Sequence, residues 1–184
     1  PESCCFKVPS HIDREVAALI EPLTIGWYSA SLGGSLKGRS VWIIGAGPIG
    51  LSVLLSVKAR GCLKSYVTER IPERALMAEK MGADRVFLVD DKNISEEVLK
   101  EVCGNIDIVF ECSGDFSTLD YALEILKPGG NLVLVGIPEV DRVSFVIDQA
   151  RRKEIRIQNV RRQNNSTEAV INAVVAKILR PELM

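Results

Sequence analysis

The 184-residue chain has a single histidine and five scattered cysteines, none of which form a C-x-x-C pair. An odd number of isolated cysteines indicates neither a disulfide framework nor a cysteine-ligated zinc site, so we expect a reducing, cytoplasmic environment. The histidine, His11, has no partner at metal-ligand spacing. We therefore interpret His11 as a surface residue.

Long apolar runs and clusters of one charge are also missing. The chain carries 23 basic and 24 acidic residues, and no basic run is longer than Arg151-Arg152-Lys153. This pattern gives no electrostatic support for binding nucleic acid or a membrane surface. No stretch approaches the roughly 18 apolar residues of a membrane span, and no signal-peptide pattern is present. We therefore expect a small molecule as the partner, with neither nucleic acid nor membrane.

The most informative stretch is a G-x-G-x-x-G pattern, Gly45-Ala46-Gly47-Pro48-Ile49-Gly50, directly after the apolar residues 41–44. Gly45 allows a sharp turn off a strand, Gly47 allows a pyrophosphate to approach the backbone, and Gly50 allows a helix to lie close to the sheet. Pro48 and Ile49 begin that helix, whose free N–H groups attract phosphate. The pattern predicts a dinucleotide site.

Strands and helices alternate along the rest of the sequence. We expect strands at residues 41–44, 65–68, 85–89, 106–110, 131–135 and 155–160, the fifth entered by a turn at 128–130. We expect helices at residues 49–60, 72–82, 94–102, 116–126, 148–153 and 167–179. Two further helices are expected before them, one from an N-cap at Ser10 to about residue 20 and one at 23–32, separated by a break at Glu21-Pro22. The alternation predicts an α/β fold: a Rossmann-type doubly wound six-stranded parallel sheet, order 3-2-1-4-5-6, with helices on both faces.

An acidic residue, Glu69, closes the second predicted strand, where a carboxylate accepts hydrogen bonds from the ribose hydroxyls of adenosine. A 2′-phosphate at this place would meet a like charge, so NAD is favoured over NADP. Arg70 and Arg74 leave an alternative open, because either could stack on adenine or neutralise a 2′-phosphate.

The ends of the fourth and fifth strands should complete the site, because ligands bind at the carboxyl edge where strand order reverses. The residues expected to face the nicotinamide ring are Cys112, Ser113, Gly114, Val135, Gly136 and Ile137. Without a histidine to activate it, Cys112 is interpreted as a small residue lining the cleft rather than as a nucleophile.

Five motifs occur in the order found in one protein family. They are E-P-L at residues 21–23, G-A-G-P-I-G at 45–50, E-C-S-G at 111–114, K-P-G-G at 127–130 and L-V-G-I-P at 134–138. Together they resemble the zinc-dependent medium-chain alcohol dehydrogenases, nearest the sorbitol and other polyol dehydrogenases. The resemblance implies NAD-linked oxidation of a secondary alcohol or polyol to a ketone, with zinc held by the full-length protein.

Most of that family's metal ligands have no counterpart in this chain, which resembles the nucleotide-binding portion with short flanks. The implied division is a flank at 1–37, an NAD-binding domain at 38–165, and at 166–184 a helix leading back to the catalytic domain. Glu21 matches the carboxylate beside the catalytic zinc, and Arg162 matches an arginine near the substrate. Arg161 and Gln163 replace two aromatic residues, which also fits a sugar phosphate or acid as substrate.

Two alternatives remain beside a dehydrogenase domain that is inactive alone. One is a stand-alone NAD(H)-binding module or redox sensor, and another is a methyltransferase, which also uses a glycine-rich turn and an acidic residue. The sequence also predicts self-association. The predicted sixth strand is an apolar edge strand, and exposed edge strands pair readily with other strands. The resemblance implies a homodimer or homotetramer formed through that edge.

Overall fold

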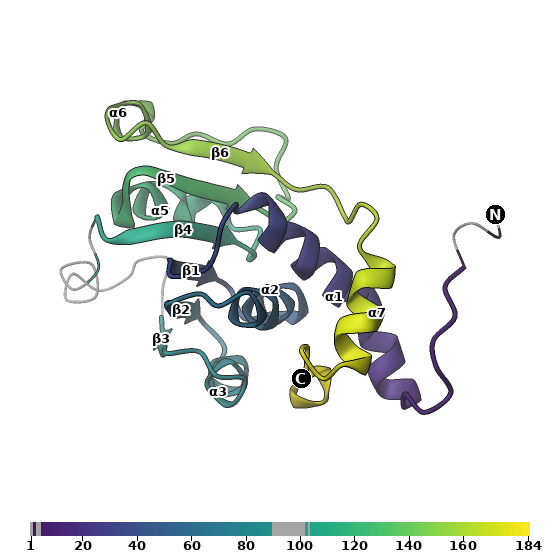
Figure 1. Ribbon diagram of the computed structural model, residues 1–184. Helices are drawn as coiled ribbons and strands as arrows, with labels where there is room; N and C mark the ends of the chain where they lie inside the picture. The colour runs from purple at the N-terminus through teal and green to yellow at the C-terminus, as the bar shows by residue number, and fades with distance from the viewer. Residues whose placement is uncertain (1, 3–4, 90–101, 103) are drawn as a thin grey trace.

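The structure is a computed structural model that describes residues 2, 5–89, 102 and 104–184. Its centre is a six-stranded parallel sheet in the order β3-β2-β1-β4-β5-β6 (Figure 1). The strands are β1 Ser40–Ile44, β2 Lys64–Glu69, β3 Arg85–Leu88, β4 Ile106–Glu111, β5 Leu126–Leu134 and β6 Arg156–Asn159. The predicted fold class and strand order are confirmed.

Helices cover both faces of the sheet. They are α1 Arg14–Leu32, α2 Pro48–Ala59, α3 Pro72–Lys80, α5 Leu119–Ile125, α6 Ile147–Arg152 and α7 Thr167–Val175, with single 3-10 turns at Phe116–Thr118 (η2) and Pro181–Leu183 (η3). One apolar cluster joins α1, α2 and α7 to one face of the sheet, and a second joins α5 and α6 to the other. The helix expected at 94–102 lies, apart from Val102, outside the described residues.

The first helix differs from the prediction. Residues 14–32 form one uninterrupted helix that contains Pro22, and its N-cap is Asp13 rather than Ser10. A proline inside a helix costs about 3 kcal/mol, but packing on neighbouring helices offsets that cost. Leu23, directly after Pro22, is fully buried, and Gly26 lies so close to α2 that a Cβ would be 2.4 Å from the Ser52 carbonyl carbon. The predicted break at Glu21-Pro22 was therefore wrong.

The fifth strand also begins earlier than predicted. The Pro128-Gly129-Gly130 segment, expected to be a turn, lies within β5. Ile106 pairs with Leu126, whereas Ile108 pairs with Asn131, so β5 advances five residues while β4 advances two. The extra residues form an irregularity in the ladder, with Gly129 at φ 74°, a conformation that glycine adopts without strain.

Serine–aspartate pairs tie neighbouring strands together at the amino edge of the sheet. The carboxylate of Asp107, the second residue of β4, accepts hydrogen bonds from the Ser40 backbone N–H (2.9 Å) and hydroxyl (2.8 Å), and pairs with Arg39 and Lys127. Although burial raises it, the pKa of Asp107 is held far below its ordinary value by hydrogen bonds from Lys127, Ser40 and Arg39. The carboxylate is therefore charged throughout the physiological range.

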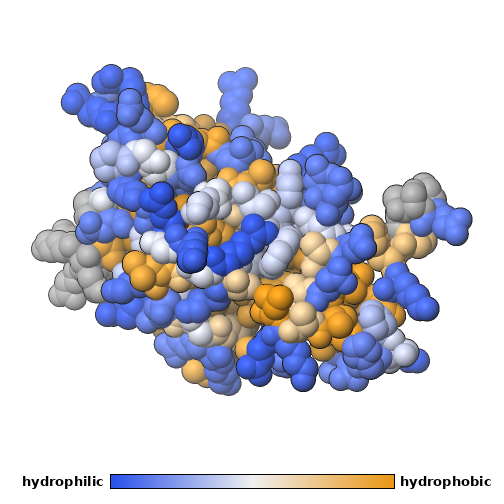
Figure 2. Space-filling model, in the orientation of Figure 1, coloured by the Kyte–Doolittle hydropathy of each residue, from blue (hydrophilic) through white to orange (hydrophobic). Residues whose placement is uncertain are grey.

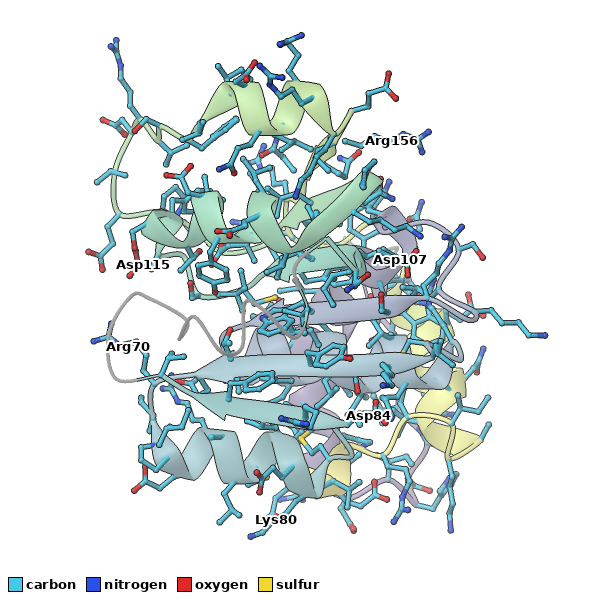
Figure 3. The ribbon with its side chains drawn as sticks, turned by 90° about the vertical axis from the view of Figure 1, so that its left-hand side faces the viewer. Arg70, Lys80, Asp84, Asp107, Asp115 and Arg156 are labelled. Atoms are coloured by element: carbon cyan, nitrogen blue, oxygen red, sulfur yellow. The ribbon has the colours of Figure 1, made fainter. Side chains whose placement is uncertain are left out.

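A second pair repeats the arrangement one strand away. The Asp84 carboxylate accepts from the Ser65 N–H (2.8 Å) and hydroxyl (2.6 Å), and Lys58 donates to it from α2. Burial raises the pKa of Asp84, but hydrogen bonds from Ser65 and Lys58 outweigh it and lower the pKa. Figure 3 shows the labelled Asp84 and Asp107 at one end of the strands, and Arg70 and Asp115 at the other.

Three aromatic rings stack across β1, β2 and β3. Trp42 lies 5.3 Å from both Tyr66 and Phe87, measured between ring centroids, and the rings are nearly parallel. The Trp42 indole N–H donates to the Thr68 hydroxyl at 3.3 Å, so its polar atom is satisfied although the residue is fully buried. The stack covers the face of the sheet opposite α2, just below the glycine turn.

Candidate functional site

The glycine turn has the geometry that its sequence predicts. Gly45 directly follows β1 at φ 92°, in the left-handed region that favours glycine, and its N–H donates to the Thr68 carbonyl. A Cβ on Gly50 would lie 1.9 Å from the Gly45 carbonyl oxygen, so no larger residue fits there. Gly47 is the N-cap of α2, and Pro48 is its first residue. The turn therefore presents the free N–H groups of a 12-residue helix at the carboxyl edge of the sheet.

Glu69 joins the end of β2 to this turn. Its Oε2 accepts from the Ala46 N–H at 2.6 Å, and its Oε1 accepts from the Arg70 (2.7 Å) and Ile71 (2.9 Å) N–H groups. The sequence predicts that this carboxylate accepts hydrogen bonds from ribose hydroxyls. However, backbone N–H groups already occupy three of its roughly four acceptor positions. One position on Oε2 remains for a ribose hydroxyl, so that role stays a prediction.

The two arginines flank the same site from different sides. The Arg74 guanidinium lies on α3 beside the glycine turn, with Nη1 3.9 Å from where a Cβ on Gly47 would be. Arg70 follows β2 directly and lines a separate hollow beyond it. Both side chains are exposed, so each can approach a ligand phosphate or an adenine ring.

The hollow beside Arg70 is a cavity of about 650 Å³. Its walls come from the turn after β4 and the loop after β5. The lining residues are Arg70, Ser113, Gly114, Asp115, Phe116, Ser117, Ile137, Glu139, Val140, Arg142, Val143 and Ser144. Its size and its place at the carboxyl edge suit one end of a dinucleotide.

Four predicted site residues line that cavity, namely Arg70, Ser113, Gly114 and Ile137. Cys112, Val135 and Gly136 do not line it. Cys112 instead packs against the apolar core, and burial raises the pKa of its thiol well above the ordinary value. The sequence reasoning did not single out the other lining residues, although they directly follow two predicted strand ends and the carboxyl-edge rule could have found them.

The turns after β4 and β5 contact each other through two glycines. A Cβ on Gly114 would lie 2.6 Å from the Ile137 carbonyl oxygen, and one on Gly136 would lie 2.3 Å from the Gly114 nitrogen. Beneath them lies Glu111, fully buried, whose Oε1 accepts from the Ser113 and Gly114 N–H groups. Glu111 was not singled out from the sequence, although an acidic residue closing an apolar strand is a signal worth reading.

Two residues transferred from the family resemblance lie away from the cavity. Glu21 is exposed on the middle of α1 rather than held at a helix junction, which corrects the expected local structure. Arg162 is exposed between β6 and α7 at φ 54°. The zinc-proximal and substrate-binding roles of these residues stay predictions. His11 is exposed ahead of α1, and its expected surface position is confirmed.

The described part of the chain holds neither a cluster of metal ligands nor a membrane-spanning helix. Within it, no group of three or more His, Cys, Asp or Glu side chains is placed to hold a metal ion. The residues described here therefore do not fit a catalytic zinc, which takes three protein ligands and an open position. In the same residues, no helix combines the length and apolarity needed to cross a bilayer.

Comparison with known proteins identifies the chain's relatives. The profile of the zinc-binding dehydrogenases matches residues 48–177. Human sorbitol dehydrogenase is 32% identical over 177 residues, which cover 94% of this chain and 49% of that protein. The chain thus spans about half the length of the curated relatives it matches. The resemblance inferred from the motifs is confirmed.

Two solved structures share the fold over the whole chain. A dehydrogenase from Sinorhizobium meliloti 1021 that holds NADP has a TM-score of 0.90 at 23% identity, and this chain covers 55% of it. The alcohol dehydrogenase rspB from E. coli CFT073, in complex with NADH, has a TM-score of 0.91 at 24% identity, and this chain covers 54% of it. At these identities the likeness shows the fold.

Proposed function

The chain belongs to the zinc-binding dehydrogenase family, and from that membership we propose that it is the NAD-binding half of an enzyme that oxidises a secondary alcohol or polyol to a ketone. The observation that carries the proposal is the geometry of the glycine turn. Gly50 has no room for a side chain, and the Ala46 N–H within the turn donates a hydrogen bond to Glu69. Helix N–H groups and the Glu69 carboxylate lie together at one edge of the sheet, which supports a dinucleotide site there.

Each part of the site would have its own task. The turn at Gly45, Gly47 and Gly50 would hold the pyrophosphate, and Glu69 would accept from a ribose hydroxyl. The cavity lined by Arg70, Ser113, Gly114 and Ile137 would take one end of the dinucleotide. The Gly114 and Gly136 turns would leave room for a flat nicotinamide ring. When bound, NAD supplies the hydride acceptor, and the chain's residues bind it, orient it and exclude water.

The chain's surface supports a role as part of a larger unit. Figure 2 shows apolar side chains gathered over α7 and the adjoining part of the chain's amino-terminal segment. The exposed apolar residues of these segments include Phe6, Val175 and Ile178. A surface of this kind favours contact with further protein, and it is where we propose that a zinc-bearing domain would lie. Glu21, exposed on the neighbouring α1, would then approach the metal.

The substrate class is proposed to be a polyol or a related sugar derivative. Arg162 would donate to a substrate hydroxyl from the segment after β6. The adjacent Arg161 is also exposed, which fits an anionic sugar acid or phosphate as well as a neutral polyol.

The cofactor assignment is tested by comparing NAD with NADP. We expect the 184-residue chain to bind NADH more tightly than NADPH in a calorimetric titration, because Glu69 repels a 2′-phosphate. Glu69→Ala should weaken NADH binding by about tenfold and narrow the difference between the two dinucleotides. Unchanged affinities in this variant would refute the assignment to Glu69.

Other measurements separate the two alternative functions. Stabilisation by S-adenosylmethionine and not by NADH in a thermal-unfolding assay would indicate a methyltransferase. A native reading frame no longer than this chain, together with NADH binding, would indicate a stand-alone binding module or redox sensor.

Self-association through β6 is a further part of the proposal. This edge strand has exposed residues along its whole length, including Ile157. Unpaired N–H and C=O groups on such an edge pair with a second copy unless they are covered. Sedimentation equilibrium should therefore give the mass of a dimer or tetramer. A strictly monomeric mass at micromolar concentration would contradict it for this chain.

A further inference from the structure

Glu111 is a fully buried carboxyl group with one oxygen saturated and the other without a partner. Its Oε1 accepts from the Ser113 N–H (2.8 Å), the Gly114 N–H (3.0 Å) and the Ser113 hydroxyl. Its Oε2 is buried and has no hydrogen-bond partner among the described residues. Such a group is rare in a folded protein, because an unsatisfied buried oxygen costs about 1–3 kcal/mol.

The unpartnered oxygen is aimed at the turn after β5. A Cβ on Gly136 would lie 2.5 Å from Oε2, so only the hydrogens of a glycine fit between the carboxyl group and that turn. The Gly136 N–H also donates to the Glu111 carbonyl at 2.9 Å. Glu111 therefore holds one nicotinamide-facing turn through Oε1 and touches the other through Oε2.

The surroundings of Glu111 hold acidic and neutral groups. Its strand neighbours are Ile44 on β1 and Leu134 on β5, and the adjacent turn carries Asp115. Burial raises the pKa of Glu111, hydrogen bonds from Ser113 and Gly114 oppose the rise, and Asp115 adds to it. Within the described residues, no salt bridge reaches the carboxyl group.

Two other titratable side chains lie near it. The Tyr121 hydroxyl on α5 is within 3.5 Å of the Thr68 hydroxyl, and burial raises the pKa of Tyr121 above its ordinary value. The Cys112 thiol is the neighbouring residue, and its pKa is raised as well. Burial raises the pKa values of all three groups, and the Glu111 carboxyl is the one whose ordinary pKa lies in the acidic range.

Resting on the proposed function, we propose that Glu111 is a positioning residue whose protonation sets the relative affinity of the site for NAD⁺ and NADH. The oxidised nicotinamide ring is a cation and the reduced ring is neutral. An ionised Glu111 behind Gly136 attracts the cation through a region of low dielectric, whereas a neutral Glu111 does not. Binding of NAD⁺ therefore releases the Glu111 proton to solvent, and binding of NADH does not.

The coupling has a definite sign. Because the carboxyl group favours its neutral form in the free protein, the affinity for NAD⁺ rises as pH rises through the pKa of Glu111. The affinity for NADH stays nearly constant over the same range. The ratio of the two affinities should change by about fivefold or more between about pH 4.3, the ordinary pKa of glutamate, and about pH 9.

The test is calorimetric titration of the 184-residue chain with NAD⁺ and NADH over this pH range, in two buffers of different ionisation enthalpy. The buffer difference gives the number of protons released on binding. The wild-type chain should release protons with NAD⁺ and none with NADH. Glu111→Gln keeps the shape of the side chain and cannot titrate, so it should show no release and a constant affinity ratio.

Two further variants separate charge from structure. Glu111→Asp retains an ionisable group, so it should restore the pH dependence while weakening both affinities, because the shorter side chain no longer reaches Ser113. Asp107→Asn removes a carboxylate at the opposite edge of the sheet, and it should keep the wild-type proton release.

The outcomes are distinguishable. Binding of both dinucleotides with a constant affinity ratio in the wild-type chain overturns this proposal and leaves the proposed function intact. Proton release by Glu111→Gln equal to that of the wild type also overturns it. Absence of dinucleotide binding at every pH overturns the proposed function and this proposal together. The wild-type measurement alone decides the matter if Glu111→Gln does not fold.

Discussion

The two edges of the sheet use carboxylates in opposite ways. At the amino edge, Asp107 and Asp84 hold neighbouring strands through serine N–H groups, and each is also paired with a cation. At the carboxyl edge, Glu69 and Glu111 also accept backbone N–H groups, but within the described residues neither forms a salt bridge. The same hydrogen-bonding device serves both ends.

The difference lies in what neutralises the charge. Hydrogen bonds from serines and from cations lower the pKa values of the two aspartates, which are partly exposed and remain ionised. Glu111 is fully buried and its pKa is raised. One edge thus stabilises the fold, and the other keeps backbone N–H groups and an uncompensated acid where a charged ligand would bind. Within the described residues, the edge where we propose that a ligand binds therefore lacks the charge pairing that stabilises the opposite edge.

The largest expected effects come from glycine substitutions. Gly50→Ala at the carboxyl edge would place a Cβ 1.9 Å from the Gly45 carbonyl oxygen, and Gly38→Ala before β1 would meet nothing within 4 Å. We expect Gly50→Ala to lower the free energy of unfolding by more than about 3 kcal/mol and to abolish NADH binding. Gly38→Ala, at φ 75°, should cost about 1 kcal/mol and leave binding intact. Urea unfolding and calorimetry measure both effects, and equal losses in the two variants would contradict this account.

The amino edge is tested by Asp107→Asn, which removes the charge that Arg39 and Lys127 face. We expect a loss of about 2 kcal/mol in the free energy of unfolding near pH 7. Because the folded-state pKa is lowered, the stabilisation is fully present above the unfolded-state pKa of about 4 and is lost as pH falls through the folded-state value. The difference between variant and wild type should therefore shrink in acid. A difference that stays constant down to about pH 3 would show that the charge is not its source.

The carboxyl edge should show the opposite sign, with a smaller effect. The folded-state pKa of Glu111 is raised, so its burial penalty is absent below the unfolded-state pKa of about 4.3 and grows as pH rises through the folded-state value. Glu111→Gln should therefore be more stable than the wild type by about 1 kcal/mol near pH 8 and about equal to it near pH 4. Denaturant unfolding at the two pH values measures the effect. If Glu111→Gln were less stable than the wild type near pH 8, the expectation that ionised Glu111 destabilises the fold would be wrong.

The sheet could be predicted because its order follows from local patterns. Buried parallel strands are short apolar runs closed by glycine or an acidic residue, and right-handed crossovers leave few arrangements of six such strands. The break at Pro22 was predicted by a local rule as well, and there the rule failed. Packing of Leu23 and Gly26 against α2 depends on residues about 30 positions away, which no local pattern contains.

The candidate site could be predicted by place and only partly by residue. Arg70, Ser113, Gly114 and Ile137 were expected at the carboxyl edge, and they line the cavity. The hydrogen bond from the Ala46 N–H to Glu69 could not be predicted, because it depends on the distance between two turns and not on spacing along the chain. Glu111 was passed over because its importance lies in complete burial and an unpartnered oxygen, properties of the packed interior.

The aromatic stack beneath the glycine turn gives the chain an optical reporter. Trp42, three residues before Gly45, is fully buried against Tyr66 and Phe87. The only other tryptophan in the sequence, Trp27 on α1, lies under the Arg60 guanidinium. Reduced nicotinamide absorbs light at the wavelengths at which tryptophan emits. A dinucleotide at the glycine turn would therefore quench Trp42 by energy transfer and emit in its place, so the unlabelled chain would signal its own occupancy.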